Sequence, residues 1–537
     1  MFLLLALATA FAQDQCATPE ASFDYTEGFR SQRGNDTENA LASYTRCLEK
    51  DPDCVACQYE IGWSYWTRSE WDQVIGAWER TLVLQPGNGA AIEWLVKARE
   101  NKSGSVPSAG GTGLHVAIGT TSSPADAPVQ LELIGRFQNY NPNPSNAADH
   151  HDIDIYSPKS ARFLGDGTRV YVNSLEGLKT VVYDPRDISK VHTITHTFGA
   201  EDAGLFQGMT TVYDYPYMRT SPSGDPNQFS GKPVESALSH DDRYLWVPYY
   251  RREFDVGAGS PSAVSIIDTQ TNEVVRVLPT GPIPKYVAIS PDNTWAAITH
   301  WGDNTVAMVD ISSGDPAQFT YRDERLVVER ILSQQGLTGS NRDSACGSCL
   351  RGTTFTPDGE TLLVARMGDG GIAGFDVDSG TYLGTVDGPR PTPRHLVVSP
   401  DGQTLFFTSN RSGTVSRAPL SDLVSALRGA EGGHVDMEFR STSVGGGART
   451  LEVSPDGRYL FTAVNGRSQI VVVDANTLDV VAKVRTDSFT VGLAVSPDGS
   501  QVWTTSQGRS TRGGGNSVCV YGVTYRTVAE SFTPLAD

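Results

Sequence analysis

The chain has 537 residues, with 43 Lys and Arg against 62 Asp and Glu, a formal net charge of −19 and 39% hydrophobic residues. These values exclude a wholly disordered or collagen-like chain. They also argue against nucleic acid and anionic membrane surfaces as partners, because both attract a basic surface.

The N-terminal segment predicts export. Residues 1–12 read MFLLLALATAFA, an apolar run that ends in small residues, which is typical of a secretory signal peptide. A membrane-spanning helix needs about 20 apolar residues, so we expect no transmembrane segment and a secreted or periplasmic mature protein. Cys16 follows the expected cleavage site, but Gln15 lacks the small side chain of a lipoprotein box, which makes a lipid anchor the minor interpretation.

Seven cysteines include two C-x-x-C pairs, Cys54/Cys57 and Cys346/Cys349. Neither pair is followed by His, which excludes c-type haem, and no other cofactor is predicted. In an exported protein we expect each pair to form a local disulfide, in preference to metal or redox chemistry. A four-thiolate zinc site that joins both pairs would have to bridge two domains, so we expect no metal site. The odd count leaves at least one thiol free or intermolecular.

Residues 21–101 show helical periodicity and an internal offset of 34 residues. The pairs at this offset are Gly28 and Gly62, Ala40 and Val74, Tyr44 and Trp78, Cys47 and Thr81, and Pro52 and Pro86. A small residue where two helices cross, an aromatic residue in the second helix and a closing proline favour a helix-turn-helix solenoid. The pattern resembles two tetratricopeptide repeats followed by a helix over 90–101. The resemblance implies a groove for a protein or peptide partner, and a structural docking role is the alternative.

A linker and a second repeat follow. Residues 102–128 are rich in Gly, Ser, Pro and Ala, which is typical of a linker. Over 129–537, an apolar strand, a turn that resembles Ser-Pro-Asp-Gly and a second strand recur seven times. The turn aspartates are Asp166, Asp241, Asp292, Asp358, Asp401, Asp456 and Asp498. Four antiparallel strands in each of seven units predict a seven-bladed β-propeller.

The blades over 290–310 (SPDN to NTVAMVD) and 454–484 (SPDG to QIVVVD and VVAKV) resemble the YVTN-type bacterial β-propeller repeats. The resemblance covers nearly all of 155–537 and implies the fold. Its relatives include lactonases, quinoprotein and haem oxidoreductases, and surface proteins of no known activity, so it implies little about function. We expect a strand within Val129–Phe137 to close the ring by pairing with the last blade.

A basic ring is predicted at one mouth of the channel. The residue seven positions before each turn aspartate begins an innermost strand, and this series is Lys159, Val234, Lys285, Arg351, Arg394, Arg449 and Val491. Five of the seven are basic in an acidic protein. The loops between second and third strands emerge on the same face and add Arg366 and Arg411 as further candidate ligand-binding residues.

Five like charges around one opening repel one another, so they need an acidic counterpart. Either carboxylates such as Glu235, Asp303 and Asp369 pair with the ring, or an anionic ligand binds there, and both can hold at once. Phosphate and carboxylate suit the bidentate grip of Arg.

Hydrolysis at this mouth would need a base for water and a stabiliser for an oxyanion. The candidate catalytic residues are His300, His395, Glu235 and Asp303, and the alternative for each histidine is an ordinary loop residue. The sequence holds no Ser-His-Asp elbow, no H-E-x-x-H and no phosphate-binding Gly loop between a strand and a helix.

The first functional hypothesis is therefore an exported, non-enzymatic binding protein, with helical repeats for a protein partner and a basic propeller mouth for an anionic ligand or second partner. The alternative is a propeller lactonase that hydrolyses an anionic sugar or dicarboxylate lactone. A structural scaffold is the third.

Overall fold

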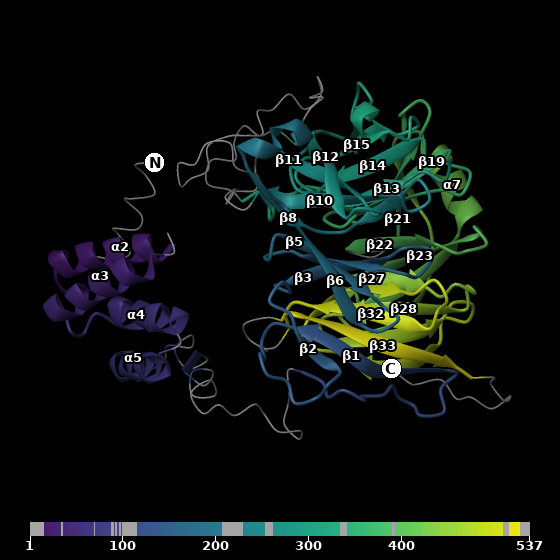
Figure 1. The fold of residues 1–537 in the computed structure, drawn as a ribbon. Helices are drawn as coiled ribbons and strands as arrows, with labels where there is room; N and C mark the ends of the chain where they lie inside the picture. Colours follow the sequence, from purple (N-terminus) through teal and green to yellow (C-terminus); the bar gives the residue numbers. More distant parts are fainter. Residues whose placement is uncertain are drawn as a thin grey trace. The chain divides into compact units, whose positions relative to one another are not determined.

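The computed structural model describes residues 16–526, apart from 34–35, 69, 87, 89–90, 92–93, 96–97, 99–114, 207–228, 253–260, 333–340, 389–391 and 509–514. The chain divides into two compact units, Met1–Gly113 and Leu114–Asp537. The first contains helices and the second mainly strands (Figure 1). This order confirms the predicted fold class, a helical region followed by an all-β propeller. The predicted signal peptide over 1–12 lies outside the described residues.

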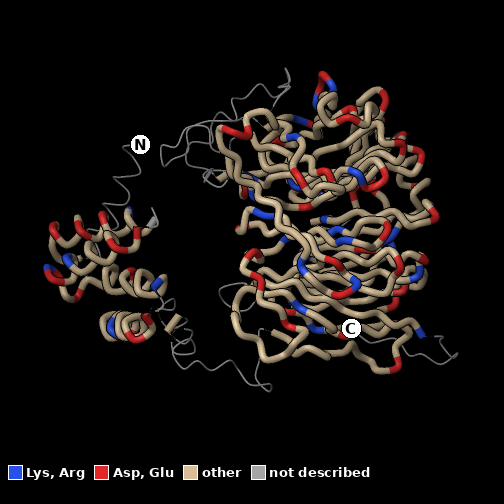
Figure 2. The backbone as a smooth tube through the Cα atoms, in the orientation of Figure 1, with Lys and Arg blue, Asp and Glu red and all other residues tan. Residues whose placement is uncertain are grey.

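The described residues of the helical unit contain two consecutive helix pairs. The first pair is α2 (Pro19–Arg33) and α3 (Thr37–Lys50), and the second is α4 (Val55–Thr67) and α5 (Trp71–Leu84). The 34-residue offset has a direct structural cause, because a side chain at Gly28 would collide with the ring of Tyr44, and one at Gly62 with the ring of Trp78. Acidic residues outnumber basic ones on these helices (Figure 2).

Only part of the third predicted helix, over 90–101, lies within the described residues. Of that part, Ala91, Leu95 and Ala98 are buried in one cluster with Val74 and Trp78.

The strands of the second unit form seven sheets, one per blade. Blades one to three comprise β3 (Pro158–Phe163), β4 (Val170–Ser174), β5 (Lys179–Asp184) and β6 (Ser189–Thr195), then β7 (Thr197–Phe198), β8 (Phe229–Pro233), β9 (Ala237–Ser239), β10 (Tyr244–Arg252), β11 (Ser262–Asp268) and β12 (Glu273–Thr280), and then β13 (Pro284–Ile289), β14 (Trp295–His300), β15 (Thr305–Asp310), β16 (Thr320–Tyr321) and β17 (Leu326–Val327). The short helices η1 (Ala200–Phe206) and η2 (Pro316–Gln318) lie between strands.

Blades four to seven complete the ring. They comprise β18 (Leu350–Phe355), β19 (Thr361–Arg366), β20 (Ile372–Asp376), β21 (Tyr382–Asp387) and β25 (His434–Asp436), then β22 (Pro393–Val398), β23 (Thr404–Ser409), β24 (Thr414–Pro419) and β26 (Arg440–Ser443), then β27 (Ala448–Val453), β28 (Tyr459–Val464), β29 (Gln469–Asp474) and β30 (Val480–Arg485), and finally β31 (Thr490–Val495), β32 (Gln501–Ser506), β33 (Ser517–Tyr525), β1 (Val129–Gln138) and β2 (Asp149–His151). Helix α7 (Leu420–Gly429) follows β24.

The first strand of the propeller closes the ring, as predicted. β1 pairs antiparallel with β33, from Val129 opposite Tyr525 to Gln138 opposite Ser517, so the two ends of the unit share one blade (Figure 1). Such closure holds both ends of the unit in one sheet, in which β2 is the outer edge strand.

The predicted linker over 102–128 is too long. Residues 102–114 lie outside the described residues, but Val116 and Ala127 are buried in the core beside Leu131. The backbone N–H of Ser123 donates to the carbonyl of Lys483 at 2.9 Å. The composition suggested a flexible segment, but its few apolar residues fill space between blades six and seven.

The hydrophobic core lies between the blades. One cluster joins Phe137 and Trp503 of blade seven to Tyr183 of blade one, and a similar cluster joins each further pair of neighbouring blades. Because each sheet packs its two faces on its neighbours, the innermost strands β3, β13, β18, β22, β27 and β31 lie side by side around the channel.

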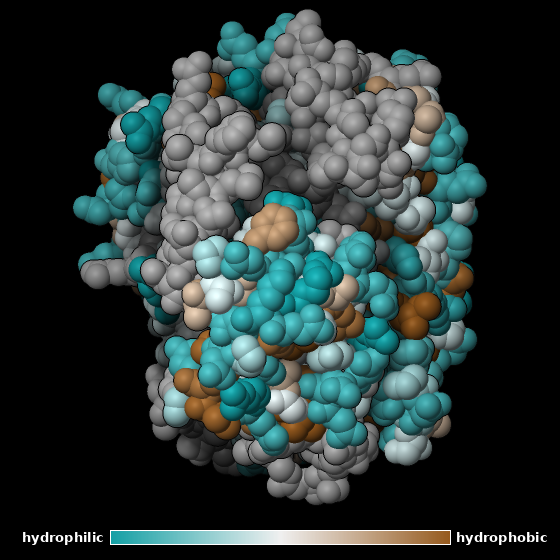
Figure 3. Space-filling view, turned by 90° about the vertical axis from the view of Figure 1, so that its left-hand side faces the viewer, coloured by the Kyte–Doolittle hydropathy of each residue, from teal (hydrophilic) through white to brown (hydrophobic). Residues whose placement is uncertain are grey.

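No helix among the described residues is both long and apolar enough to cross a membrane. Hydrophilic side chains predominate on the face shown in Figure 3, and the hydrophobic ones form small separate patches.

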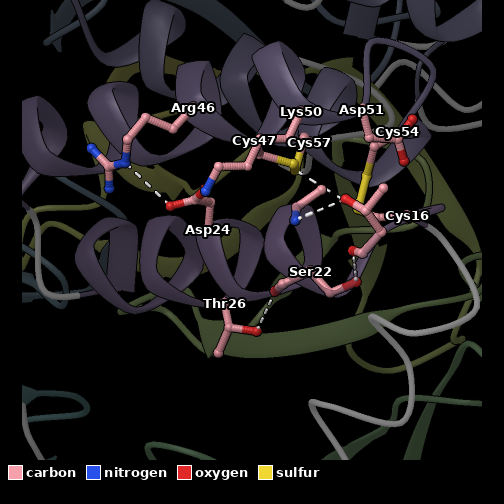
Figure 4. Close-up of a disulfide and its surroundings, with 12 residues drawn as sticks. Cys16, Ser22, Asp24, Thr26, Arg46, Cys47, Lys50, Asp51, Cys54 and Cys57 are labelled. Carbon is pink, nitrogen blue, oxygen red and sulfur yellow. Dashed lines mark hydrogen bonds and ion pairs between the residues drawn. A yellow bond between two sulfur atoms is a disulfide. The ribbon is translucent and has the colours of Figure 1, made fainter.

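Three disulfides lie in the described residues. Cys346 pairs with Cys349, as predicted, but Cys54 and Cys57 do not pair with each other. Cys54 caps the N-terminus of α4 and bonds to Cys16, whereas Cys57 lies inside α4 and bonds to Cys47 of α3 (Figure 4). The local prediction was wrong because each half of the C-x-x-C pair meets a cysteine from another segment. Cys519 is a buried free thiol.

Candidate functional site

The predicted basic residues occupy equivalent positions in the fold. Each is the second residue of an innermost strand, namely Lys159 in β3, Lys285 in β13, Arg351 in β18, Arg394 in β22 and Arg449 in β27. In each of these blades the pairing register between the first and second strands shifts across the basic residue. A register shift of this kind leaves one residue outside the ladder and redirects its side chain.

The five side chains form one electrostatic group, which we call the basic ring. The positive charges of Arg449, Arg351 and Arg394 act on Lys159, and those of Arg351 and Arg394 act on Lys285. Lys159, Arg351 and Arg394 are 9%, 5% and 6% exposed, so water screens these repulsions little.

Among the described residues, Glu235 and Asp343 pair with members of the basic ring. Oε1 of Glu235 lies 3.1 Å from Nη2 of Arg351. Burial raises the pKa of Glu235, but the charges of Arg351 and Lys159 outweigh burial and hold that pKa below its usual value. Nζ of Lys285 lies 3.6 Å from Oδ1 of Asp343 and 3.7 Å from the ring centroid of Tyr250.

Lys159 and Arg394 have no carboxylate partner. In the part of the chain that the structure describes, no Asp or Glu oxygen lies within 4.0 Å of either side chain. Nη1 of Arg394 donates to Sδ of Met367 at 3.5 Å, and a thioether sulfur is a weak acceptor. Burial lowers the pKa of the Lys159 amine well below its usual value, and the charges of Arg449 and Arg351 lower it further. Burial and the charges of Arg351 and Arg449 lower the pKa of the Arg394 guanidinium, and the carboxylate of Glu235 offsets only part of this lowering.

His395 lies beside the basic ring, but both of its ring nitrogens have partners. Nδ1 accepts a hydrogen bond from the backbone N–H of Leu451 at 3.1 Å, and Nε2 lies 2.8 Å from the hydroxyl of Tyr286. Because Nδ1 accepts, Nε2 of the neutral ring carries the proton and donates to Tyr286. Burial lowers the pKa of His395 to about 4, so the ring is neutral at pH 7 and has no lone pair free for a substrate.

His300 is fully buried in blade three. Its Nε2 accepts from the backbone N–H of Gly281 at 3.1 Å, and its Nδ1 lies 2.8 Å from Oγ1 of Thr305. Thr305 donates in turn to Oδ1 of Asp303 at 2.7 Å. Burial lowers the pKa of His300 to about 3 and raises that of Asp303 to about 6. This hydrogen-bonded chain connects β14 to the start of β15, so His300 and Asp303 hold the blade together.

The structure does not join Arg366 and Arg411 to the basic ring. Nη2 of Arg366 lies 2.7 Å from Oε1 of Glu329 and 3.5 Å from Oδ2 of Asp369. Arg411 is exposed. Neither charge is among those that act on the ring residues.

Sequence reasoning missed two features of the site. Asp343 belongs to an irregular segment without any repeat signal, between blades three and four. Arg162 and Glu452 are two partly buried, opposite charges that act on each other, and Tyr286 and Glu235 also act on Arg162. Arg162 and Glu452 each lie three residues after a member of the basic ring, so the repeat alignment could have found them.

A comparison with protein families agrees with this architecture. A family model described as lactonase, 7-bladed beta-propeller matches residues 232–512, just over half of the chain. No curated protein matches the chain. Among solved structures, hydrazine synthase of Kuenenia stuttgartiensis is 16% identical, with 72% of this chain and 100% of that chain covered and a TM-score of 0.45. The β-propeller domain of Cps50 (Swd1) from Myceliophteria thermophila is 12% identical, with 69% and 97% covered and a TM-score of 0.45.

Proposed function

The chain belongs to the lactonase family of seven-bladed β-propellers, and we propose that its basic ring binds a small anion that carries at least two carboxylate or phosphate groups. The observation that carries this proposal is the pair of unpaired cations. Lys159 and Arg394 are more than nine-tenths buried, come from blades one and five, and have no carboxylate partner in the described residues.

Burial of a cation without a counter-ion costs several kcal/mol of desolvation free energy, and in the described part of the protein no ion pair offsets that cost. A carboxylate or phosphate between Lys159 and Arg394 would satisfy both, and each charge-assisted hydrogen bond contributes about 1.5–3 kcal/mol. Glu235 and Asp343 already neutralise Arg351 and Lys285, which limits the charge that the ligand must supply.

Binding without hydrolysis is the form of this proposal that the site supports best. The ring nitrogens of His300 and His395 are engaged in hydrogen bonds, and Glu235 is held by Arg351. We propose that the protein is exported, because disulfides persist in oxidising compartments. We also propose that its helical repeats bind a protein partner.

Hydrolysis of an anionic lactone is the second candidate function. Membership of the lactonase family favours it, and so does the depressed pKa of Lys159. In its deprotonated form the Lys159 amine would take a proton from water, while the positive charge of Arg394 stabilises the oxyanion.

The test is thermal unfolding of the full chain with inorganic phosphate, citrate, malonate and hexose phosphates. Ligand at a hundred times its dissociation constant adds about 2.7 kcal/mol to the free energy of unfolding. We expect a di- or trianion to raise the unfolding midpoint of the wild type and of the exposed-arginine control Arg411→Ala. The same anion should not raise the midpoint of Arg394→Ala. Lactone forms of each active anion are then assayed for ring opening. Turnover that Lys159→Met abolishes would establish the second candidate, and a panel without any shift would overturn the anion site.

A further inference from the structure

The helical unit contains a groove of about 380 Å³ on its first helices. Tyr25 of α2, Tyr59 and Glu60 of α4, and Leu84 and Gln85 at the end of α5 line it. The wall therefore combines two phenol rings and a carboxylate, all of which are partly exposed.

The carboxylate of Glu60 is oriented but not neutralised. Nε2 of Gln32 donates to its Oε2 at 3.0 Å, and the hydroxyl of Tyr44 donates to Oε1 of Gln32 at 2.8 Å. Because Tyr44 fixes which end of the Gln32 amide faces Glu60, the carboxylate is held in place while it keeps acceptor sites. Across the described part of the chain, no Lys, Arg or His nitrogen lies within 4.0 Å of Glu60.

The sequence of the helices in this unit has a net negative charge. Between Pro19 and Leu84 the sequence has twelve Asp and Glu against six Lys and Arg. Among them, Arg46 and Lys50 pair with Asp24, and Arg68 pairs with Glu38 and Glu70. A positively charged partner would therefore be attracted to the unit as a whole and would find an unpaired carboxylate in the groove.

We propose that this groove binds a Lys or Arg side chain from a basic segment of a partner protein, with Glu60 as the counter-ion and the rings of Tyr25 and Tyr59 as the walls. An ammonium or guanidinium group gains from both a carboxylate and aromatic faces, whereas an acidic or purely apolar segment would leave Glu60 unpaired. The inference rests on the proposed role of the helical repeats in partner binding, and it does not depend on the anion site of the propeller.

The experiment measures binding of a fluorescent peptide with alternating Lys and Ala to the full chain by fluorescence anisotropy, at 50 and 150 mM salt. We expect Glu60→Gln to weaken binding about tenfold or more, and Tyr25→Leu to weaken it severalfold. Glu49→Gln is the matched control, because Glu49 is an exposed carboxylate of α3 outside the groove lining and its loss changes the net charge equally. Glu49→Gln should change the affinity for the peptide less than twofold.

Three results would overturn the inference. The first is that the wild type does not bind the peptide. The second is that Glu60→Gln and Glu49→Gln lose the same amount of peptide affinity. The third is that the wild type binds the peptide with acetylated lysines as tightly as the unmodified peptide. Circular dichroism and the unfolding midpoint show whether each variant is folded, and a misfolded Glu60→Gln is replaced by Glu60→Asp, for which we expect an intermediate loss. Citrate binding to the propeller is measured on the same samples. In the wild type, absence of citrate binding with peptide binding intact would refute the anion site alone, and absence of peptide binding with citrate binding intact would refute the groove alone.

Discussion

The carboxylate of Glu235 lies 3.1 Å from the guanidinium of Arg351, and it follows directly on Val234, the blade-two member of the ring series. Blade two therefore contributes a counter-ion where the blades on either side contribute Lys159 and Lys285. One fixed carboxylate pairs with Arg351, while Lys159 and Arg394 have none in the described part of the ring.

Removal of this counter-ion should destabilise the ligand-free protein and strengthen anion binding. We expect Glu235→Gln to lower the free energy of unfolding by about 3–5 kcal/mol, because it leaves Arg351 buried and unpaired. The same variant should bind citrate more tightly than the wild type, since a competing negative charge is gone. Urea unfolding with and without citrate measures both effects, and weaker citrate binding would show that Glu235 contributes to the ligand site instead of competing with it.

Replacement of Lys159 by Met should stabilise the ligand-free protein at pH 7. Met has nearly the size of Lys and no charge to desolvate, so the variant avoids the cost of burying the Lys159 amine. The pKa of Lys159 is lower in the folded than in the unfolded chain, where it is about 10.4. Between these two values the unfolded chain binds more protons, so wild-type stability rises with pH. The advantage of Lys159→Met should therefore shrink as the pH approaches 10, and an advantage that grows with pH would contradict the account.

Asp487 joins the start of the propeller to its last blades. Its Oδ1 lies 3.1 Å from Nη1 of Arg136 in β1 and accepts from the backbone N–H of Val116 at 2.9 Å, and its Oδ2 accepts from Ser517 at 2.8 Å. Burial raises its pKa, but the hydrogen bond from His115 and the charge of Arg136 outweigh burial and hold that pKa well below its usual range. We expect Asp487→Asn to cost about 3–5 kcal/mol at pH 7.

The pH dependence of that cost has a defined sign. A carboxylate with a depressed folded-state pKa stabilises the protein above its unfolded value of about 3.9, and this contribution is lost as the pH falls towards the folded value. The difference in stability between the wild type and Asp487→Asn should thus be constant from pH 5 to 7 and decrease below pH 4. The exposed-carboxylate control Asp479→Asn should show little difference at any pH, and a difference that persists unchanged at pH 2 would exclude this ion pair as its source.

The cysteines of the helical unit should be oxidised in the mature protein. Mass spectrometry of the non-reduced chain should find peptides that link Cys16 to Cys54 and Cys47 to Cys57, and denaturation should expose one free thiol, that of Cys519. The four sulfur atoms of the helical unit lie within 4.8 Å of one another, a spacing that also suits a tetrahedral zinc site. One zinc ion per chain with four additional thiols would replace the disulfide assignment by a metal site.

The seven blades and the basic ring were predictable because both follow from local sequence. Each turn fixes the register of its blade, so in six of the seven blades the residue seven positions before the turn aspartate is the second residue of the innermost strand. In blade two, Val234 precedes β9. Lys159 and Arg394 were identified in this way. The 34-residue repeat was predictable for a similar reason, since Gly28 and Gly62 each accommodate the aromatic ring of the following helix.

The partners of these residues were not predictable, because they come from segments without a repeat signal. Asp343 reaches Lys285 from an irregular loop, and Cys16 reaches Cys54 from a segment that precedes the first helix. The histidines carried no signal of their role either. Whether His300 is a base or a structural residue depends on the hydrogen bonds to its two ring nitrogens, which only the folded chain shows.

Calorimetric titration of the full chain with citrate tests the anion site most directly, with the wild type, the double variant Lys159→Met/Arg394→Met and the control Arg411→Met compared at 50 and 150 mM salt. The account predicts one binding site per chain in the wild type and the control, with affinity that falls at the higher salt, and no detectable binding in the double variant while its unfolding midpoint stays equal or rises. Citrate binding that survives in the double variant, or that is lost equally in Arg411→Met, would contradict the assignment of the ligand site to the two unpaired cations.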